Sequence, residues 1–216
     1  MKKILLLGAV AVVLSACGNK PKTQNETGQA GQNAEYAQYL DTLKADNNLK
    51  ITMGKVPVTI VGKELKVGAK IRGVPLVINT KLEEKNIFED KNIKVIYTAP
   101  SLDTKVCSLQ TKQLNEAAKT HTNVKFYSVT VDTPFAQERF CTANEINGLK
   151  AVSDFKYHQF GIQNGFFIKE KGLLTRALMI VDENNNVKYI EYVSEEGKEA
   201  DVDKALKFLE NKLLKK

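Results

Sequence analysis

Residues 93–131 read IKVIYTAPSLDTKVCSLQTKQLNEAAKTHTNVKFYSVTV, and this stretch decides the fold. Runs of β-branched and aromatic residues over 93–98 and 124–131 predict two strands. The stretch 103–120 between them predicts a helix that Asp103 caps. A strand, a helix and a second strand in this order favour a right-handed crossover between parallel strands. The apolar residues expected on the inner helix face are Val106, Leu109, Leu114 and Ala117.

The chain after residue 131 continues with helices and a hairpin. The turn over 182–186 contains three asparagines, which tolerate positive φ, so it predicts a hairpin between the strands that flank it. The order βαβ, helical linker, ββα predicts an α/β protein with a thioredoxin-like fold. The expected elements are a helix over 135–143 with Pro134 in its first turn, a short helix near 154–160, strands over 178–181 and 187–193, and an amphipathic helix over 202–213.

Two shorter β-like runs precede these elements. Residues 49–53 and 56–61 flank Gly54 and Lys55, and this combination favours a tight hairpin. We therefore expect the thioredoxin-like fold to carry an N-terminal β-hairpin extension. A strand over 74–79 and a loop or short helix over 81–92 are expected between the hairpin and the first long strand.

The first residues have the features of a targeting sequence. A cationic start and an apolar run over 4–14, too short to span a bilayer comfortably, predict a signal peptide over residues 1–16. The sequence Leu14-Ser15-Ala16-Cys17 resembles the bacterial lipobox. The resemblance implies cleavage before Cys17 and a diacylglyceryl group on that residue. The alternative is an ordinary signal peptide that happens to carry a cysteine.

A polar segment follows Cys17. Residues 18–34 contain almost nothing apolar, so they cannot offset the entropy of ordering and are expected to form a flexible tether. Residues 35–44 carry Tyr36, Tyr39, Leu40 and Leu43 at helical spacing, which favours a short helix after this polar segment. The chain thus divides into the signal peptide, a lipidated tether over 17–48 and one domain over 49–216. The lipid anchor would hold this domain at a membrane of the bacterial cell envelope, facing the periplasm or the outer surface.

Composition and charge limit which partners and ligands the protein is expected to bind. The net charge is +7, but no dense lysine and arginine block with interleaved aromatics occurs, which argues against nucleic acid. His121 and His158 are the only histidines and lie far apart, which argues against a metal site. With Cys17 acylated, Cys107 and Cys141 remain as thiols in an oxidising compartment. They would form either a structural disulfide or one that opens and closes during turnover.

Cys107 lies at the start of the helix expected over 103–120. Backbone N–H groups and the positive end of the helix dipole favour the thiolate there, and the thiolate is the nucleophilic form. The Thr104 hydroxyl, one turn earlier, can hydrogen-bond the sulfur, and Pro100 would wall the pocket. Residues 107–110 read Cys-Ser-Leu-Gln, so no CxxC pair is present. This absence argues against a disulfide-exchange enzyme of the envelope.

The pattern Pro100-x-x-x-Thr104-x-x-Cys107 resembles the active-site motif of the peroxiredoxin family. Three blocks in order resemble its thiol peroxidase branch, and the resemblance covers about residues 55–212. The blocks are TAPSLDTKVC over 98–107, VDTPFAQERFC over 131–141 and TRAL over 175–178.

The resemblance implies a mechanism and partners. Cys107 would attack hydrogen peroxide or an organic hydroperoxide and become a sulfenic acid, and Cys141 would resolve it as an intrachain disulfide. Pro100, Thr104 and Arg176 would complete the peroxide site, without any cofactor. A thioredoxin-like protein would reduce the disulfide, and the enzyme would be a homodimer packed near the active site.

A rival hypothesis is a non-catalytic binding lipoprotein that kept the fold and a structural disulfide. The joint presence of Pro100, Thr104, Cys107 and Arg176 argues against it. The chain departs from the family at residues 67–73, which read VGAKIRG where an acidic, proline-containing turn is usual. That departure bears on substrate shape and partner contacts.

Overall fold

The computed structural model describes residues 37–215. The predicted signal peptide, the predicted lipidation site at Cys17 and the predicted tether as far as residue 36 lie outside the described residues. Residues 1–39 and 40–216 are separate units, and the fold described below is that of the second. Residues 37–42 are helical, within the range where a short helix is expected. Between residues 37 and 215, no helix combines the length and the apolar character needed to cross a membrane.

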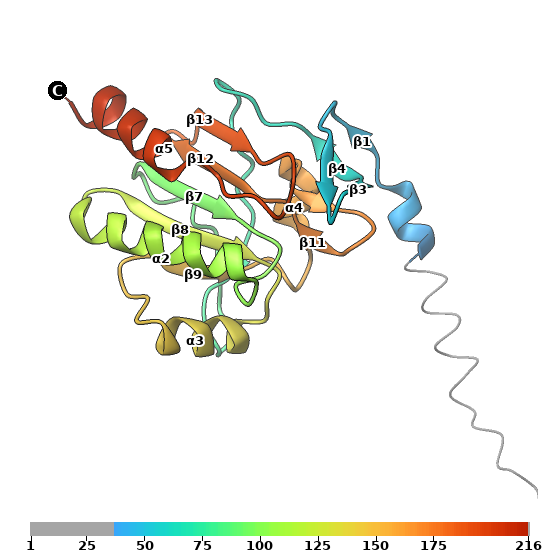
Figure 1. The fold of residues 1–216 in the computed structure, drawn as a ribbon, viewed down its shortest axis with the longest axis horizontal. Helices are drawn as coiled ribbons and strands as arrows, with labels where there is room; N and C mark the ends of the chain where they lie inside the picture. Colours follow the sequence, from blue (N-terminus) through green and yellow to red (C-terminus); the bar gives the residue numbers. More distant parts are fainter. Residues whose placement is uncertain (1–36, 216) are drawn as a thin grey trace, which may run out of the picture. The chain divides into compact units, whose positions relative to one another are not determined.

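A seven-stranded mixed sheet forms the centre of the fold (Figure 1). Its three middle strands run parallel, and the remaining pairs are antiparallel. Every residue of β7 is buried, as expected for a central strand covered on both faces. In spatial order the strands are β13 (Val187–Tyr192), β12 (Ala177–Val181), β7 (Lys94–Thr98), β8 (Lys125–Thr130), β9 (Lys150–Ser153), β5 (Leu76–Val77) and β6 (Glu84–Lys85). The parallel βαβ unit predicted from residues 93–131 is confirmed.

The helices lie on both faces of this sheet. Helix α2 (Lys105–Thr120) joins β7 to β8, and α3 (Pro134–Ala143) joins β8 to β9. Both crossovers step in the same direction along the sheet, so their right-handedness puts both helices on one face (Figure 1). Helix α5 (Val202–Leu209) packs beside α2 on this face. Helix α4 (Gln159–Asn164) and the segment 62–92 supply the apolar cluster on the other face.

The N-terminal hairpin is present and its turn follows from backbone conformation. Strands β2 (Ile51–Met53) and β3 (Val56–Val58) pair antiparallel around Gly54 and Lys55, whose φ angles are 58° and 66°. Two consecutive positive φ values are what a two-residue hairpin needs to match the twist of its strands. The run expected over 56–61 is interrupted after β3. Strand β4 (Ile60–Lys63) joins a second sheet with β1 (Ala45–Asp46), β10 (Phe167–Ile168) and β11 (Leu173–Leu174).

The inner face of α2 differs from the expected one. Leu109 is 47% exposed and Val106 is only partly buried. Leu114 packs in the core as expected. The other buried side chains of α2 are Cys107, Gln110, Thr111, Asn115 and Ala118. The pattern of apolar residues cannot find this face, because half of its buried side chains are polar: Gln110 and Asn115 have hydrogen-bond partners in the protein, and the Thr111 hydroxyl has none.

Asn115 is one of these partnered polar groups. Its Oδ1 accepts backbone N–H groups of Asn147 at 3.0 Å, Gly148 at 2.8 Å and Leu149 at 3.3 Å. These three residues belong to the loop between α3 and β9. A single buried amide therefore fixes the end of the segment that follows α3 to the middle of α2.

Several expected boundaries are wrong. The helix expected near 154–160 begins at Gln159, because Asp154 accepts the N–H groups of Phe160 and Gly161 at 3.0 and 2.9 Å and so organises the turn before α4. His158 at its N-cap is left-handed, with φ of 53°. Over 74–79 only Leu76 and Val77 are extended, and the loop expected over 81–92 contains the two-residue β6. The C-terminal helix changes to a π-helical turn after residue 209.

The Asp154 carboxyl generates a pH prediction. Burial raises its pKa to about 7, although the two N–H bonds act in the opposite direction. The folded pKa exceeds the unfolded one, so this group should add stability as the pH falls from above 7 towards 4. We expect the free energy of unfolding of wild type minus that of Asp154→Asn to increase by a few kcal/mol over this range. Urea unfolding of both proteins at several pH values measures it, and a pH-independent difference would contradict it.

Candidate active site

The site begins in the loop between β7 and α2. The N-cap of α2 is Thr104, with φ of −81° and ψ of 145°, so the expectation that Asp103 caps the helix is wrong. The Thr104 hydroxyl makes no capping bond to a backbone N–H of α2. It lies 2.7 Å from the Cys107 sulfur and 3.2 Å from the Ser101 carbonyl oxygen. Its single proton can serve only one of these acceptors at a time.

Cys107 is in the first turn of α2 and is fully buried. Besides Thr104, its sulfur contacts Nη1 of Arg176 at 3.2 Å. A hydroxyl and a guanidinium thus converge on the sulfur from different elements. Both can stabilise a negative charge on it by charge-assisted hydrogen bonds.

Arg176 directly precedes β12, and only 1% of it is exposed. Its Nη1 also donates to the Tyr97 hydroxyl, and its Nη2 donates to the Glu196 backbone carbonyl at 2.6 Å. Burial acts to lower the pKa of Arg176, but the neighbouring Tyr97 and Cys107 outweigh it and raise that pKa. The guanidinium therefore remains charged beside the sulfur.

The Glu196 carboxylate supports the backbone around Arg176. It accepts the Arg176 N–H at 2.9 and 3.1 Å and the Thr175 hydroxyl at 2.5 Å. Its oxygen lies 4.0 Å from Nε of Arg176, and that Nε has no hydrogen-bond partner. Burial raises the pKa of Glu196, against the effect of these donors. The carboxylate thus holds the chain in place more than it neutralises the guanidinium.

A hollow of about 410 Å³ opens beside these groups. Pro100, Thr104 and Arg176 line it, as the sequence predicts. The N-terminal hairpin supplies another part of the wall through Met53 and Gly54, so the extension has a place in the site. Leu173 and Val106 add apolar surface, and Glu195, Glu196 and Gly197 are also at the wall.

Cys141 is in the second half of α3 and is half-buried. Both Cys107 and Cys141 are free thiols in this structure. Burial raises the pKa of Cys141. The structure therefore brings Pro100, Thr104, Cys107 and Arg176 together in the reduced protein, whereas Cys141 is not bonded to that group.

Asp132 connects the two cysteine-bearing segments. It follows β8 just before α3, and its Oδ2 accepts the N–H of Leu102 at 2.7 Å and the hydroxyl of Thr130 at 2.9 Å. Leu102 belongs to the loop that leads into α2. The hydrogen bond from Leu102 to Asp132 joins the loop before α2 to the loop before α3, so it holds the starts of the two cysteine-bearing helices together in the reduced state.

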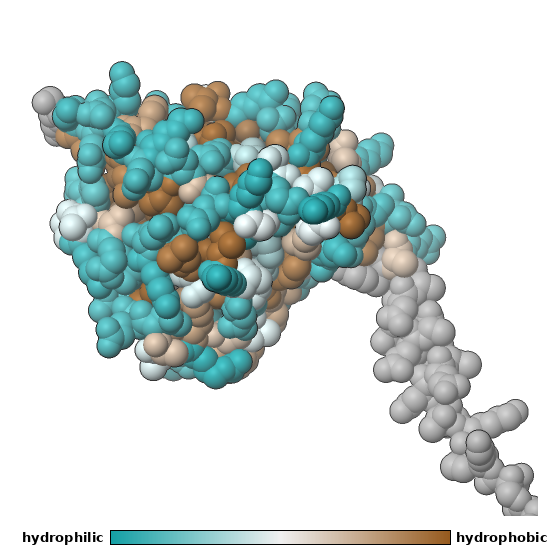
Figure 2. All heavy atoms as spheres, in the orientation of Figure 1, coloured by the Kyte–Doolittle hydropathy of each residue, from teal (hydrophilic) through white to brown (hydrophobic). Residues whose placement is uncertain are grey.

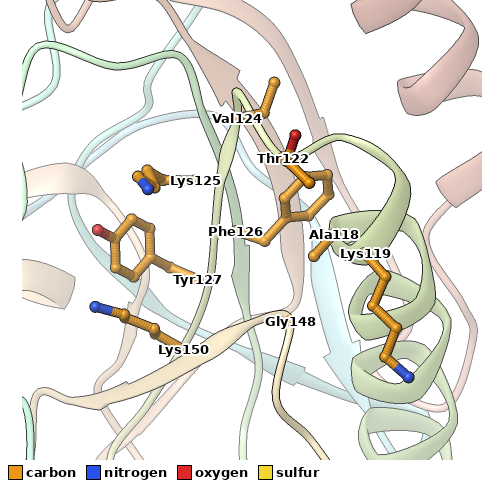
Figure 3. Close-up of a pocket in the computed structure, with 9 residues that line it drawn as sticks. All are labelled: Ala118, Lys119, Thr122, Val124, Lys125, Phe126, Tyr127, Gly148 and Lys150. Atoms are coloured by element: carbon orange, nitrogen blue, oxygen red, sulfur yellow. The ribbon is translucent and has the colours of Figure 1, made fainter.

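A second hollow, of about 290 Å³, has no cysteine among the residues that line it (Figure 3). It is at the amino ends of β8 and β9, lined by Lys119, Lys125 and Lys150 together with Phe126 and Tyr127. Cys107 instead follows the carboxyl end of β7, so this hollow has no part in thiol chemistry. No group of three potential metal-ligating side chains occurs over residues 37–215.

Three residues that contact the site were not identified from the sequence. Tyr97 looks like a core strand residue, Gln110 like a surface helix residue and Glu196 like part of a polar loop. Only their positions in space reveal them. The alternation along β7 is the one available signal, because it puts Tyr97 on the sheet face that a crossover helix covers.

Comparisons with known proteins identify the family. Residues 66–206 match the Redoxin family. A thiol peroxidase of Oceanobacillus iheyensis is 39% identical over 160 residues, which cover 74% of this chain and 97% of that protein. A thiol peroxidase of Bacillus subtilis is 42% identical over 147 residues, covering 68% and 87%.

Solved structures give the same result. A peroxiredoxin-like protein from Aquifex aeolicus superposes with a TM-score of 0.70 and 36% identity, over 74% of this chain and 95% of that one. The thioredoxin-like α/β fold predicted from element order is thereby confirmed. The chain belongs to the redoxin family and is a thiol-dependent peroxidase of the peroxiredoxin type, with a peroxide as substrate and a thiol as reductant.

Proposed function

We propose that Cys107 is the thiol that attacks the peroxide, in a site completed by Pro100, Thr104 and Arg176. The observation that carries this assignment is the convergence of the Thr104 hydroxyl and the Arg176 guanidinium on the buried sulfur, at 2.7 and 3.2 Å. A non-catalytic binding protein would not need to bury an arginine against a thiol. The absent CxxC pair weighs against a disulfide-exchange enzyme.

The first step transfers one oxygen. The Cys107 thiolate attacks one peroxide oxygen, an S–O bond forms, and the O–O bond breaks. The leaving oxygen departs as hydroxide or alkoxide and takes a proton from water. Arg176 and Thr104 orient the two oxygens and stabilise the charge that moves onto the leaving one. Pro100 walls the pocket and limits access of water.

The second step resolves the product. The Cys141 thiolate attacks the sulfenic sulfur of Cys107, a disulfide forms and hydroxide leaves. A disulfide requires Cα atoms within about 7 Å. The Cys107 sulfur is buried in a helical turn and hydrogen-bonded to Thr104 and Arg176, so we propose that the start of α2 and the segment around Cys141 loosen to let the two sulfurs meet. A thioredoxin-like protein then reduces the disulfide by exchange.

We also propose the anchored location predicted from the first residues: signal peptide 1–16, lipid on Cys17, and a domain at the cell envelope.

We further propose that the protein is a homodimer. Supporting it are the 47% exposed Leu109 and the partly exposed Val106 of α2 next to the site. Figure 2 shows hydrophobic atoms at the surface of the face that carries α2. Sedimentation at micromolar concentration distinguishes dimer from monomer.

Cys107→Ser should lower the rate of peroxide reduction by about a thousandfold or more, because a serine hydroxyl is essentially un-ionised near neutral pH. Steady-state consumption of hydrogen peroxide with a thioredoxin system measures this. Cys141→Ser is the matched control in a single-turnover measurement without reductant, since it removes a thiol but should leave the first oxygen transfer, the loss of one peroxide per chain, intact. A Cys107→Ser variant with near wild-type activity would refute the assignment.

Resolution should depend on pH through Cys141. The thiolate is the attacking form, and burial raises the pKa of Cys141 in the folded protein, so disulfide formation should accelerate as the pH rises above neutral. Acid-quenched samples analysed by mass spectrometry give the rate and the expected intrachain Cys107–Cys141 bond.

In Cys141→Ser, Cys107 should turn over once and then over-oxidise. An interchain bond, or normal cycling of that variant, is the contrary result.

The anchor has its own test. Cys17→Ala should move the protein from the membrane fraction to the soluble fraction, because the variant lacks the residue that would carry the acyl chains of a stable anchor. The rate of peroxide reduction should stay within about twofold of wild type, since Cys17 is not part of the proposed peroxide site. Fractionation, with mass spectrometry of the N-terminal peptide, measures both. Wild-type protein without lipid mass in the soluble fraction would rule out the anchor.

A further inference from the structure

A buried polar chain leads away from Arg176. Nη1 of Arg176 donates to the Tyr97 hydroxyl, and that hydroxyl donates to Oε1 of Gln110 at 3.0 Å. Gln110 lies one turn after Cys107 in α2. Tyr97 and Gln110 are both fully buried, so no water is available to replace a lost partner.

The orientation of the Gln110 amide is determined by a third residue. Its Nε2 donates to the Ala200 carbonyl at 2.7 Å, and its Oε1 accepts the Ala200 N–H at 3.2 Å. A flipped amide would oppose donor to donor and acceptor to acceptor at Ala200. Oε1 must therefore face Tyr97.

This orientation fixes the direction of every bond in the chain. Since Gln110 presents an acceptor, the single phenolic proton of Tyr97 points to Gln110. The lone pairs of the Tyr97 oxygen are then directed at Nη1 of Arg176. Burial, and then the neighbouring Cys107, raise the pKa of Tyr97, so the phenol keeps this proton across the working pH range.

We propose that Tyr97 and Gln110 are positioning residues that hold the Arg176 guanidinium against the Cys107 sulfur. Both ends of the relay are tied to the same helix turn, because Cys107 and Gln110 are neighbours on α2. The relay thus couples the position of α2 to the arginine that directly precedes β12. This inference rests on the proposed role of Cys107 and adds two residues to the site.

Tyr97→Phe tests the relay, because it removes one hydroxyl and keeps the ring that fills the core. The full-length chain with Cys17→Ala and Cys141→Ser leaves Cys107 as its single thiol. We expect its second-order rate with hydrogen peroxide to fall about tenfold, the effect of losing one hydrogen bond to a charged group. The midpoint of the pH profile of this rate should also move upward, because a less constrained guanidinium stabilises the thiolate less.

Tyr192→Phe is the matched control. The Tyr192 hydroxyl accepts the Leu65 N–H at 3.1 Å, and its ring packs against Phe166 in the cluster on the other face of the sheet. The Tyr192→Phe variant therefore loses one hydrogen-bonded hydroxyl and leaves the thiol site unchanged. Its rate and pH profile should equal those of the parent protein.

A double-mutant cycle separates positioning from general support of the fold. Gln110→Met alone should slow the reaction, but in the Tyr97→Phe background it should add little, because the relay is already broken. Additive losses would mean that Gln110 acts only by holding Ala200. An unchanged rate and pH profile in Tyr97→Phe would overturn the relay while leaving the role of Cys107 intact. Reaction of Cys107→Ser with peroxide would instead overturn the proposed function.

Discussion

A sulfur that carries negative charge inside a protein needs a positive charge beside it, and Arg176 at 3.2 Å from the Cys107 sulfur supplies that charge. Burying a guanidinium is itself unfavourable unless its donors are satisfied. The surrounding structure provides acceptors for Nη1 and Nη2, the Tyr97 hydroxyl and the Glu196 carbonyl, and leaves only Nε without one. Much of the conformation near the site follows from the need to bury one cation next to one thiol.

Sheet pairing brings the two charged groups together. Thr98, the last residue of β7, pairs with Ala177, the first residue of β12. The Thr98 side chain strengthens the junction, since its hydroxyl donates to the Thr175 carbonyl at 2.7 Å and accepts the Ala177 N–H at 3.1 Å. The loop that leads to Cys107 and the residue before β12 are therefore fixed at the same edge of the sheet. Sequence separation between Cys107 and Arg176 matters little once this register is set.

The fold was predictable where periodicity is strong. Strands β7, β8 and β12 are rich in apolar, β-branched and aromatic residues, and the sequence predicts their ends to within two residues. The segment 62–92 shows no hydrophobic periodicity, because its conformation depends on long-range contacts. One of them is the hydrogen bond from the Arg72 N–H to Oδ1 of Asn164. Pro100, Thr104, Cys107 and Arg176 came from motif resemblance and are together in space. Tyr97, Gln110 and Glu196 were missed, since a buried polar network is a property of three-dimensional contacts.

The amide of Asn115 has a consequence for the resolving step. It pins residues 147–149, and Asp132 is held near Leu102, so the segment that carries Cys141 is fastened at both ends. If α3 melts, Cys141 explores only the volume that a loop of this length can reach. Short flexible loops give effective concentrations in the millimolar range. Such confinement would let the thiol of the same chain compete against dilute external thiols and a second peroxide molecule, even when most of α3 is transiently unfolded.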